Sequence, residues 1–161
     1  MSFTTPDLCD QFAQHLRAAE PLFRDWGGVL SFAGQIETVR VFDDNALVRQ
    51  VLESEGRGRV LVVDGGGSVR SALVGGRLAA LAQQNGWSGL VVHGCIRDSA
   101  ELAGTAVGVK ALHAVPMQSG KAGTGQRSVP VTFAGVTFTP GAYLYADRDG
   151  MLVADRDLLR P

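Results

Sequence analysis

Three charged side chains near residue 100 are the first candidates for chemistry. Arg97, Asp98 and Glu101 follow an apolar run, residues 89–94, that has the composition of a buried strand. On a turn of helix, carboxylates at i and i+3 face the same way and offer hard oxygens to Mg²⁺ or Mn²⁺. Arg97 could clamp a carboxylate or stabilise an oxyanion. Taken alone, the pair fits a solvated, salt-bridged turn equally well.

A second candidate is the sequence Gly75-Gly76-Arg77-Leu78, in which two glycines precede a predicted helix. The first turn of a helix presents unpaired N–H groups and the positive end of the helix dipole, so its backbone can hold a carboxylate. Glycines allow a ligand to approach closely. The alternative is an ordinary flexible turn, which the local sequence alone favours.

Other motifs favour structural roles. Residues 62–67, Val-Val-Asp-Gly-Gly-Gly, resemble a nucleotide-binding turn, but Arg70 stands where a dinucleotide fingerprint needs its third glycine. A tight turn is the better interpretation. Residues 120–125 predict a mobile loop and not a phosphate-binding loop. The three histidines lack metal-ligand spacing, and no nucleophile-elbow motif occurs.

The periodicity predicts an α/β region followed by a mostly β region. The expected order is a helix from an N-cap at Thr5 to about Arg17, a strand at 35–42, a helix at 46–53 capped by Asp43 or Asp44, a strand at 59–64, an extended stretch at 68–73, a helix from 76 to 85, a strand at 89–94 and a helical turn at 99–102. Short strands are then expected at 111–115, 129–133, 136–138, 143–146 and 152–154. No linker separates the two regions, so residues 1–161 are expected to form one domain.

Composition narrows the classes of partner. The chain has 161 residues and a formal net charge of −1, without a run of basic residues, so a direct nucleic-acid partner is not expected. Cys9 and Cys95 are expected to stay reduced. We see no membrane-length apolar stretch and no apolar segment typical of a signal peptide in the first 20 residues. We therefore expect a cytoplasmic protein that does not bind membranes.

Taken together, the sequence resembles the RraA-like family, which includes regulators of ribonuclease E and class II 4-hydroxy-4-methyl-2-oxoglutarate aldolases. The resemblance covers nearly the whole chain. It is carried by residues 5–10, 26–28, 32–34, 44–45, 62–68, 135–138 and 140–141.

A spaced motif connects the two candidate sites. Catalytic members of the family resemble one another in a glycine, twenty intervening residues, Arg-Asp, two more residues and an acid. Here these are Gly76, Arg97-Asp98 and Glu101. The resemblance implies that the backbone of residues 75–78 and the Arg97 side chain bind substrate, that Asp98 binds a divalent metal cation, Mg²⁺ or Mn²⁺, and that Glu101 supports the metal through water.

The resemblance also implies a fold and an activity. The family's fold is a three-layer β/β/α sandwich of the swivelling-domain type, assembled as a homotrimer or paired trimers with active sites between subunits. The implied reaction is metal-dependent cleavage of 4-hydroxy-4-methyl-2-oxoglutarate, a small 2-keto acid, to two pyruvates, with oxaloacetate decarboxylation through the same enolate. The alternative is a non-catalytic regulator that binds and inhibits ribonuclease E.

Overall fold

The computed structural model describes residues 2–160. Its helices are short and lie at α1 (Thr5–Phe12), α2 (Ala46–Leu52), α3 (Gly76–Gln84) and α4 (Ser99–Ala103). Its strands are β1 (Leu16–Ala18), β2 (Arg24–Asp25), β3 (Phe32–Arg40), β4 (Val60–Asp64), β5 (Ala72–Val74), β6 (Gly89–Ile96), β7 (Gly108–Ala114), β8 (Gln126–Arg127), β9 (Val131–Phe133), β10 (Val136–Phe138), β11 (Tyr143–Asp147) and β12 (Gly150–Ala154).

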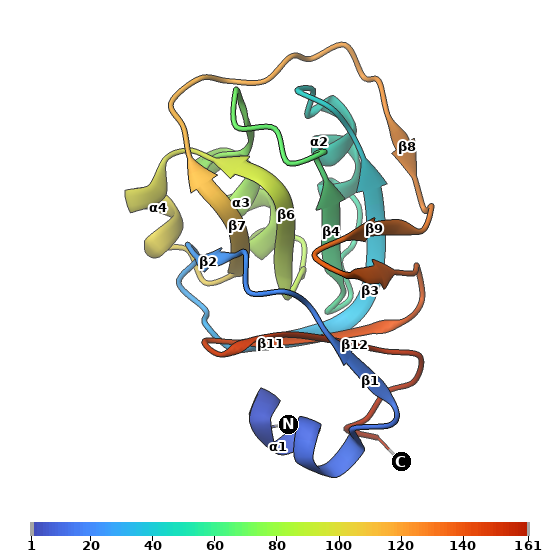
Figure 1. Cartoon of the computed structure of the whole chain (residues 1–161). Coiled ribbons are helices and arrows are strands. Elements are labelled where there is room, and N and C mark those ends of the chain that lie inside the picture. Colours follow the sequence, from blue (N-terminus) through green and yellow to red (C-terminus); the bar gives the residue numbers. More distant parts are fainter. Residues whose placement is uncertain (1, 161) are drawn as a thin grey trace.

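Strand β3 joins two differently built parts of one sheet, whose order is β1-β12-β11-β3-β4-β6-β7-β2 (Figure 1). Its first half pairs antiparallel with β11, and its second half, residues 36–40, pairs parallel with β4. Strands β4, β6 and β7 continue the parallel part. Their carboxyl ends therefore meet at one edge, where ligands of α/β proteins commonly bind.

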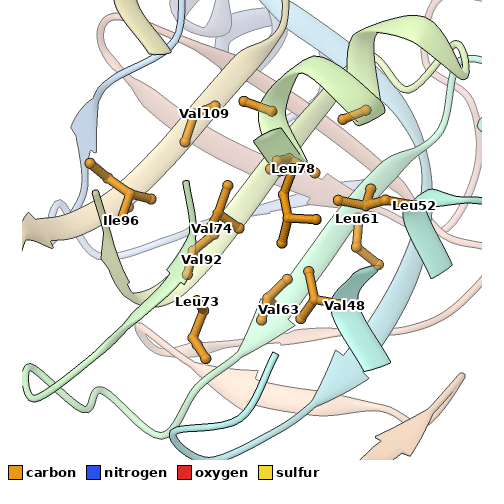
Figure 2. Close-up of a cluster of buried hydrophobic side chains, with 14 of the residues drawn as sticks. Val48, Leu52, Leu61, Val63, Leu73, Val74, Leu78, Val92, Ile96 and Val109 are labelled. Atoms are coloured by element: carbon orange, nitrogen blue, oxygen red, sulfur yellow. The ribbon is translucent and has the colours of Figure 1, made fainter. Parts of the chain in front are cut away.

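Burial on both faces of the parallel strands produces three layers. Odd and even residues of a strand point to opposite faces, so Leu61 and Val63 of β4 pack against α2 and α3 while Val60 and Val62 face the β9–β10 hairpin. Figure 2 shows the helix-side cluster, in which Leu52, Leu61 and Leu78 converge. The β/β/α sandwich implied by the family resemblance is confirmed, with α1 packed separately on β11 and β12.

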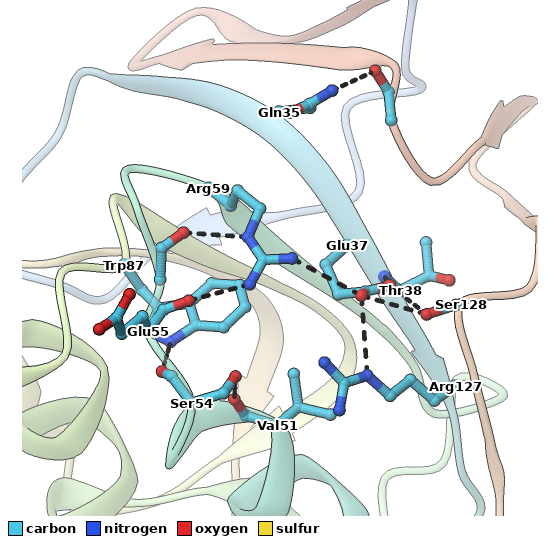
Figure 3. A network of polar contacts seen from close by, with 12 residues as sticks. Gln35, Glu37, Thr38, Val51, Ser54, Glu55, Arg59, Trp87, Arg127 and Ser128 are labelled. Carbon is cyan, nitrogen blue, oxygen red and sulfur yellow. Dashed lines mark hydrogen bonds and ion pairs between the residues drawn. The ribbon is translucent and has the colours of Figure 1, made fainter.

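A buried carboxylate on β3 is neutralised by its neighbours (Figure 3). The Glu37 side chain is 9% exposed and lies 3.7 Å from the guanidinium groups of both Arg59 and Arg127. Its oxygens also accept hydrogen bonds from the Thr38 backbone N–H at 2.8 Å and the Ser128 hydroxyl at 2.9 Å. We refer to these five residues as the Glu37 network, in which the negative charge has several partners.

The expected elements are largely present, but the prediction for the N-terminal helix was wrong at both ends. Thr4 is the N-cap and its hydroxyl accepts from the Asp7 N–H, because the Thr5 hydroxyl instead donates to Asp147. The helix stops at Phe12, well before Arg17, since the chain must then form β1 against β12. Three short strands of the main sheet, β1, β2 and β8, were also missed.

Two further expectations concern turns and membranes. The glycines after Asp64 form a tight turn, in which the N–H groups of Gly65 and Gly67 both donate to the His93 carbonyl and that of Gly66 donates to Asp64. These donors are used internally, which supports the structural interpretation of this motif.

Among residues 2–160, no helix is long and apolar enough to cross a membrane.

Candidate active site

A pocket of about 570 Å³ lies beside the N-terminus of α3, near the carboxyl ends of the parallel strands. Pockets of this size commonly hold small ligands. One wall comes from α3 and the segment after β6, and the other from the start of α2 and the chain after β7. The lining residues are Asn45, Ala46, Arg49, Ala72, Gly75, Arg77, Leu78, Arg97, Asp98, Gln118 and Lys121. The two candidate sites of the sequence thus share one pocket.

Gly75 and Gly76 are needed because acidic side chains approach the backbone there. A Cβ atom on Gly76 would lie 2.0 Å from a carboxylate oxygen of Glu101, and one on Gly75 would lie 2.8 Å from a carboxylate oxygen of Asp98. Either contact would force a shift. This packing gives a physical reason for the spaced motif, since the glycines and the acids occupy adjoining space. Glu101 lies behind Gly76 and does not line the pocket itself.

Asp98 has an unusual backbone conformation. Its φ of 58° and ψ of 45° place it in the left-handed region, at the N-cap of α4. Its Oδ2 atom accepts a hydrogen bond of 2.9 Å from the Gly76 N–H, which joins the two halves of the motif. Non-glycine residues in this region often occur at functional sites. Within residues 2–160, its Oδ1 atom has no hydrogen-bond partner.

Arg97 and Asp98 are adjacent but do not neutralise each other. In the described part of the chain, no carboxylate lies within 4.0 Å of the Arg97 guanidinium. The only side-chain hydrogen bond of Arg97 there is a long one, 3.5 Å, to the Pro116 carbonyl. The geometry thus excludes the salt-bridged turn, and it leaves a positive charge free to face a ligand.

The N-terminus of α3 offers backbone donors to the same pocket. The Gly76 N–H is used by Asp98, whereas the N–H groups of Arg77 and Leu78 belong to the first turn, which has no intrahelical acceptors. The Leu78 side chain is buried in the core at 7% exposure. Because the side chain of Leu78 is buried, its backbone is the part that could bind a ligand, and substrate binding by this backbone stays a prediction.

The donor atoms fit a hard divalent cation. Asp98 brings a carboxylate oxygen next to Gly75, and Glu101 brings one next to Gly76. No group of three or more His, Cys, Asp or Glu side chains assembles anywhere in residues 2–160. Mg²⁺ is commonly held by one or two carboxylates and keeps several waters, so this sparse donor set suits it. Asp98, with one free oxygen, is the residue that would hold the ion.

A neighbouring acid, Asp43, has a supporting role. Its carboxylate accepts hydrogen bonds of 2.7 Å from the hydroxyls of both Ser68 and Ser71. The Ser68 hydrogen bond, then that of Ser71, lowers the pKa of Asp43 below its usual value, and Arg70 adds to this effect. Asp43 therefore stays ionised while holding the loop after β4 against the loop after β3.

Sequence reasoning missed the second wall of the pocket. Asn45, Arg49, Gln118 and Lys121 line it, yet Arg49 was read only as part of an amphipathic helix and Lys121 as part of a mobile loop. The signal that could have found them is their position. Asn45 and Lys121 follow β3 and β7, which belong to the same sheet as β6, the strand that Arg97 follows, so all three residues come after the carboxyl ends of strands of one sheet.

Comparison with known proteins agrees with this architecture. The family model RraA-like, described as Aldolase/RraA, matches residues 5–153. A protein of Alkalilimnicola ehrlichii, provisionally named 4-hydroxy-4-methyl-2-oxoglutarate aldolase, is 57% identical, with 99% of each chain covered. A Dechloromonas aromatica protein of the same provisional name is 54% identical, over 98% of this chain and 99% of its own.

Two solved structures have nearly the same fold. A Geobacillus kaustophilus protein, described as S-adenosylmethionine:2-dimethylmenaquinone methyltransferase, is 51% identical and superimposes with a TM-score of 0.97 over 99% of each chain. The RNA-processing inhibitor RraA of Thermus thermophilus is 48% identical, with a TM-score of 0.94 over 99% of this chain and 98% of its own. With a family model that spans almost its whole length, this chain belongs to the RraA-like family.

Proposed function

We propose that this protein is an aldolase that cleaves 4-hydroxy-4-methyl-2-oxoglutarate into two molecules of pyruvate, using a divalent metal ion. The observation that carries the proposal is the unpaired Arg97 guanidinium beside Asp98, at a helix N-terminus with free N–H groups. Such a site suits a 2-keto acid, because one end binds a carboxylate and the other stabilises negative charge. The names of relatives above 50% identity support the same activity.

The residues suggest how cleavage proceeds. The N–H groups of Arg77 and Leu78 hold the carboxylate next to the keto group. When the C3–C4 bond breaks, its electrons move to the keto oxygen, and Arg97 stabilises the resulting enolate. The C4 hydroxyl loses its proton to a water in the pocket, and C4 becomes the ketone of one pyruvate. Glu101, which does not line the pocket, would act indirectly by supporting the water shell of the proposed metal ion. Protonation of the enolate at C3 gives the other.

The proposed ion on Asp98 adds to this electrostatic stabilisation. A divalent cation bound there would act as a Lewis acid that favours negative charge on the keto oxygen. Because loss of CO₂ from oxaloacetate produces the same pyruvate enolate, we propose that the protein also decarboxylates oxaloacetate. Arg97 would then serve both reactions in the same way.

The test is pyruvate release from each of the two substrates by the wild-type protein, with Mg²⁺ and then with excess chelator. We expect turnover that the chelator abolishes and that added Mg²⁺ restores. The Arg97→Ala and Asp98→Ala variants should be nearly inactive while they remain folded. Turnover that is insensitive to chelator, or to both substitutions, would overturn the metal-site mechanism.

A second candidate function is regulation of RNA processing, which the similarity to the Thermus thermophilus inhibitor favours. In this case the chain would bind ribonuclease E without using Arg97 or Asp98 for chemistry. A pull-down with purified ribonuclease E separates the candidates. Binding that persists in Asp98→Ala, together with absence of pyruvate release by the wild-type protein, would favour the regulator.

A further inference from the structure

The glycine-rich segment after β7 is tied to the loop after β3. The Gly120 N–H donates to the Asp43 carbonyl at 2.8 Å, and the Asn45 N–H donates to the Gly120 carbonyl at 3.1 Å. The carboxylate of Asp44, which is 4% exposed, accepts from the N–H groups of Ala122 and Gly123. This part of residues 120–125, expected to be a mobile loop, is therefore anchored at the pocket.

The anchored segment presents Lys121 to the pocket. Its ammonium group donates to the Asn45 side-chain oxygen, and the Asn45 amide nitrogen donates in turn to the Leu73 carbonyl at 3.1 Å. That second bond fixes the amide so that its oxygen faces Lys121. An ammonium group has three donors, and the amide is neutral. Within residues 2–160 no carboxylate lies within 4.0 Å of this ammonium, so its charge is not neutralised.

The charges of the pocket do not balance. Its lining includes four cationic side chains, those of Arg49, Arg77, Arg97 and Lys121, but only one carboxylate, that of Asp98. None of the four forms an ion pair in the described chain. The single carboxylate of a pyruvyl group, held at the N-terminus of α3, would leave Lys121, which lines the pocket from the segment after β7, without a partner.

We infer that Lys121 binds the second carboxylate of the substrate and makes the pocket selective for dicarboxylic 2-keto acids. This inference rests on the proposed function and adds a specificity-determining residue to it. Asn45 and Asp44 act as positioning residues, because they hold the lysine through the amide and through the backbone of its segment. Arg49, exposed on α2, lies at the same wall and adds positive charge.

The test compares two substrates that differ only at the far end. One is 4-hydroxy-4-methyl-2-oxoglutarate, and the other is 4-hydroxy-4-methyl-2-oxopentanoate, in which a methyl group replaces the second carboxylate. We expect the wild-type protein to prefer the dicarboxylate. The ratio of kcat/KM for the two substrates should fall about 10- to 100-fold in Lys121→Met, the loss typical of a hydrogen bond to a charged group. The change should lie mainly in KM, and Lys121→Arg should retain most of the preference.

A matched control removes a positive charge elsewhere. The Arg57 side chain is 78% exposed and lines a different surface, so Arg57→Met should keep the wild-type ratio within about twofold. A wild-type protein without preference, or a Lys121→Met variant whose kcat/KM falls equally for both substrates, would overturn the role of Lys121. Because Lys121 is exposed, its substitution is expected to leave the fold intact, which a melting curve checks.

A third measurement separates this inference from the proposed function. Exchange of pyruvate methyl protons with D₂O, followed by NMR, requires only the pyruvyl group and its enolate. If the wild-type protein neither exchanges these protons nor cleaves either substrate, the proposed function itself fails. If it does both and Lys121→Met keeps the wild-type substrate ratio, only the assignment of Lys121 fails.

Discussion

Two charged regions of this protein are built on opposite principles. In the Glu37 network, a buried carboxylate is surrounded by two guanidinium groups, a hydroxyl and a backbone N–H. Arg97, Asp98 and Lys121 all line the pocket, yet the two cations have no carboxylate partner in residues 2–160. In the Glu37 network the charges are neutralised by other residues of the chain, whereas in the pocket the cations remain available to a bound ligand.

The difference follows from the energetics of buried charge. Removing one partner from a buried ion pair leaves an uncompensated charge, which is costly to stability. Unpaired charges at a pocket contribute little to stability, and their interactions become strong only when a ligand excludes water. We therefore expect substitutions in the two regions to change different measurements.

The largest effect is expected for Arg97→Ala. The rate of pyruvate release, as kcat/KM, should fall about 10²- to 10³-fold, as it does when a donor that stabilises an oxyanion is removed. The free energy of unfolding, from urea titration, should change by less than about 0.5 kcal/mol because Arg97 has no ion pair to lose. A large loss of stability would show that Arg97 has a structural role and would contradict the proposed difference between the pocket and the Glu37 network.

The reverse result is expected for Glu37→Ala. The free energy of unfolding should fall by about 2–3 kcal/mol, a value below that of a fully buried pair because the Arg59 and Arg127 side chains are 25% and 40% exposed. The folded fraction should keep its activity. Glu55→Ala is the matched control, since the Glu55 side chain is 81% exposed and its pair with Arg57 should contribute about 0–1 kcal/mol.

A smaller effect on activity is expected for Gly76→Ala, because Gly76 lies against the carboxylate of Glu101. In Gly76→Ala the new methyl group would displace the Glu101 carboxylate, the far end of a flexible side chain, so the fold should tolerate it. We expect activity to fall about tenfold through misplacement of the site. Gly104→Ala controls for helix-end effects, because a Cβ there would make only an ordinary contact of 3.7 Å. Equal activity losses in both variants would contradict the packing argument.

The smallest effect is a pH dependence of stability at Asp147, a second carboxylate that the chain satisfies internally. Burial would raise its pKa, but hydrogen bonds from the Thr5 hydroxyl, the Thr5 N–H and the Asp149 N–H, together with the charge of Lys110, outweigh burial and lower the pKa below its usual value. A lowered pKa stabilises the fold above the unfolded-state pKa, and this stabilisation is lost as the pH falls through the folded-state value.

The variant that tests this is Asp147→Asn. It should be less stable than the wild type by about 1 kcal/mol at pH 7, and the difference should shrink as the pH falls below 4. Urea titrations at pH 7, 5, 4 and 3 measure it. A difference that is the same at every pH would show that the carboxylate charge is not what stabilises this contact.

The sequence predicted the elements whose signal is local. Strands β4 and β6 are continuous apolar runs, and α3 begins at the second of two glycines, so their positions followed from composition and periodicity alone. Strands β1, β2 and β8, of two or three residues each, form through pairing with distant strands, and their own residues carry no pattern. For the same reason the N-terminal helix was extended into residues that pair with β12.

The sequence predicted only those residues of the site that belong to the spaced motif. Gly75, Gly76, Arg97 and Asp98 have a spacing that indicates one site, and the structure brings them together with Glu101 beside them. Asn45 and Lys121 are separated by 76 residues and touch only because the segment after β7 returns to the loop after β3. No local pattern specifies that return, so the second wall of the pocket was missed.

The pairing of β1 with β12 also constrains the order in which the protein can form. Leu16 lies opposite Ala154, so this sheet edge cannot close until almost the entire chain has left the ribosome. Contacts this distant in sequence make folding slow. During synthesis β11 is absent until late, and the edge of β3 with which it pairs stays open to other chains. We therefore expect nascent chains of this protein to depend on chaperones until the last strand has been made.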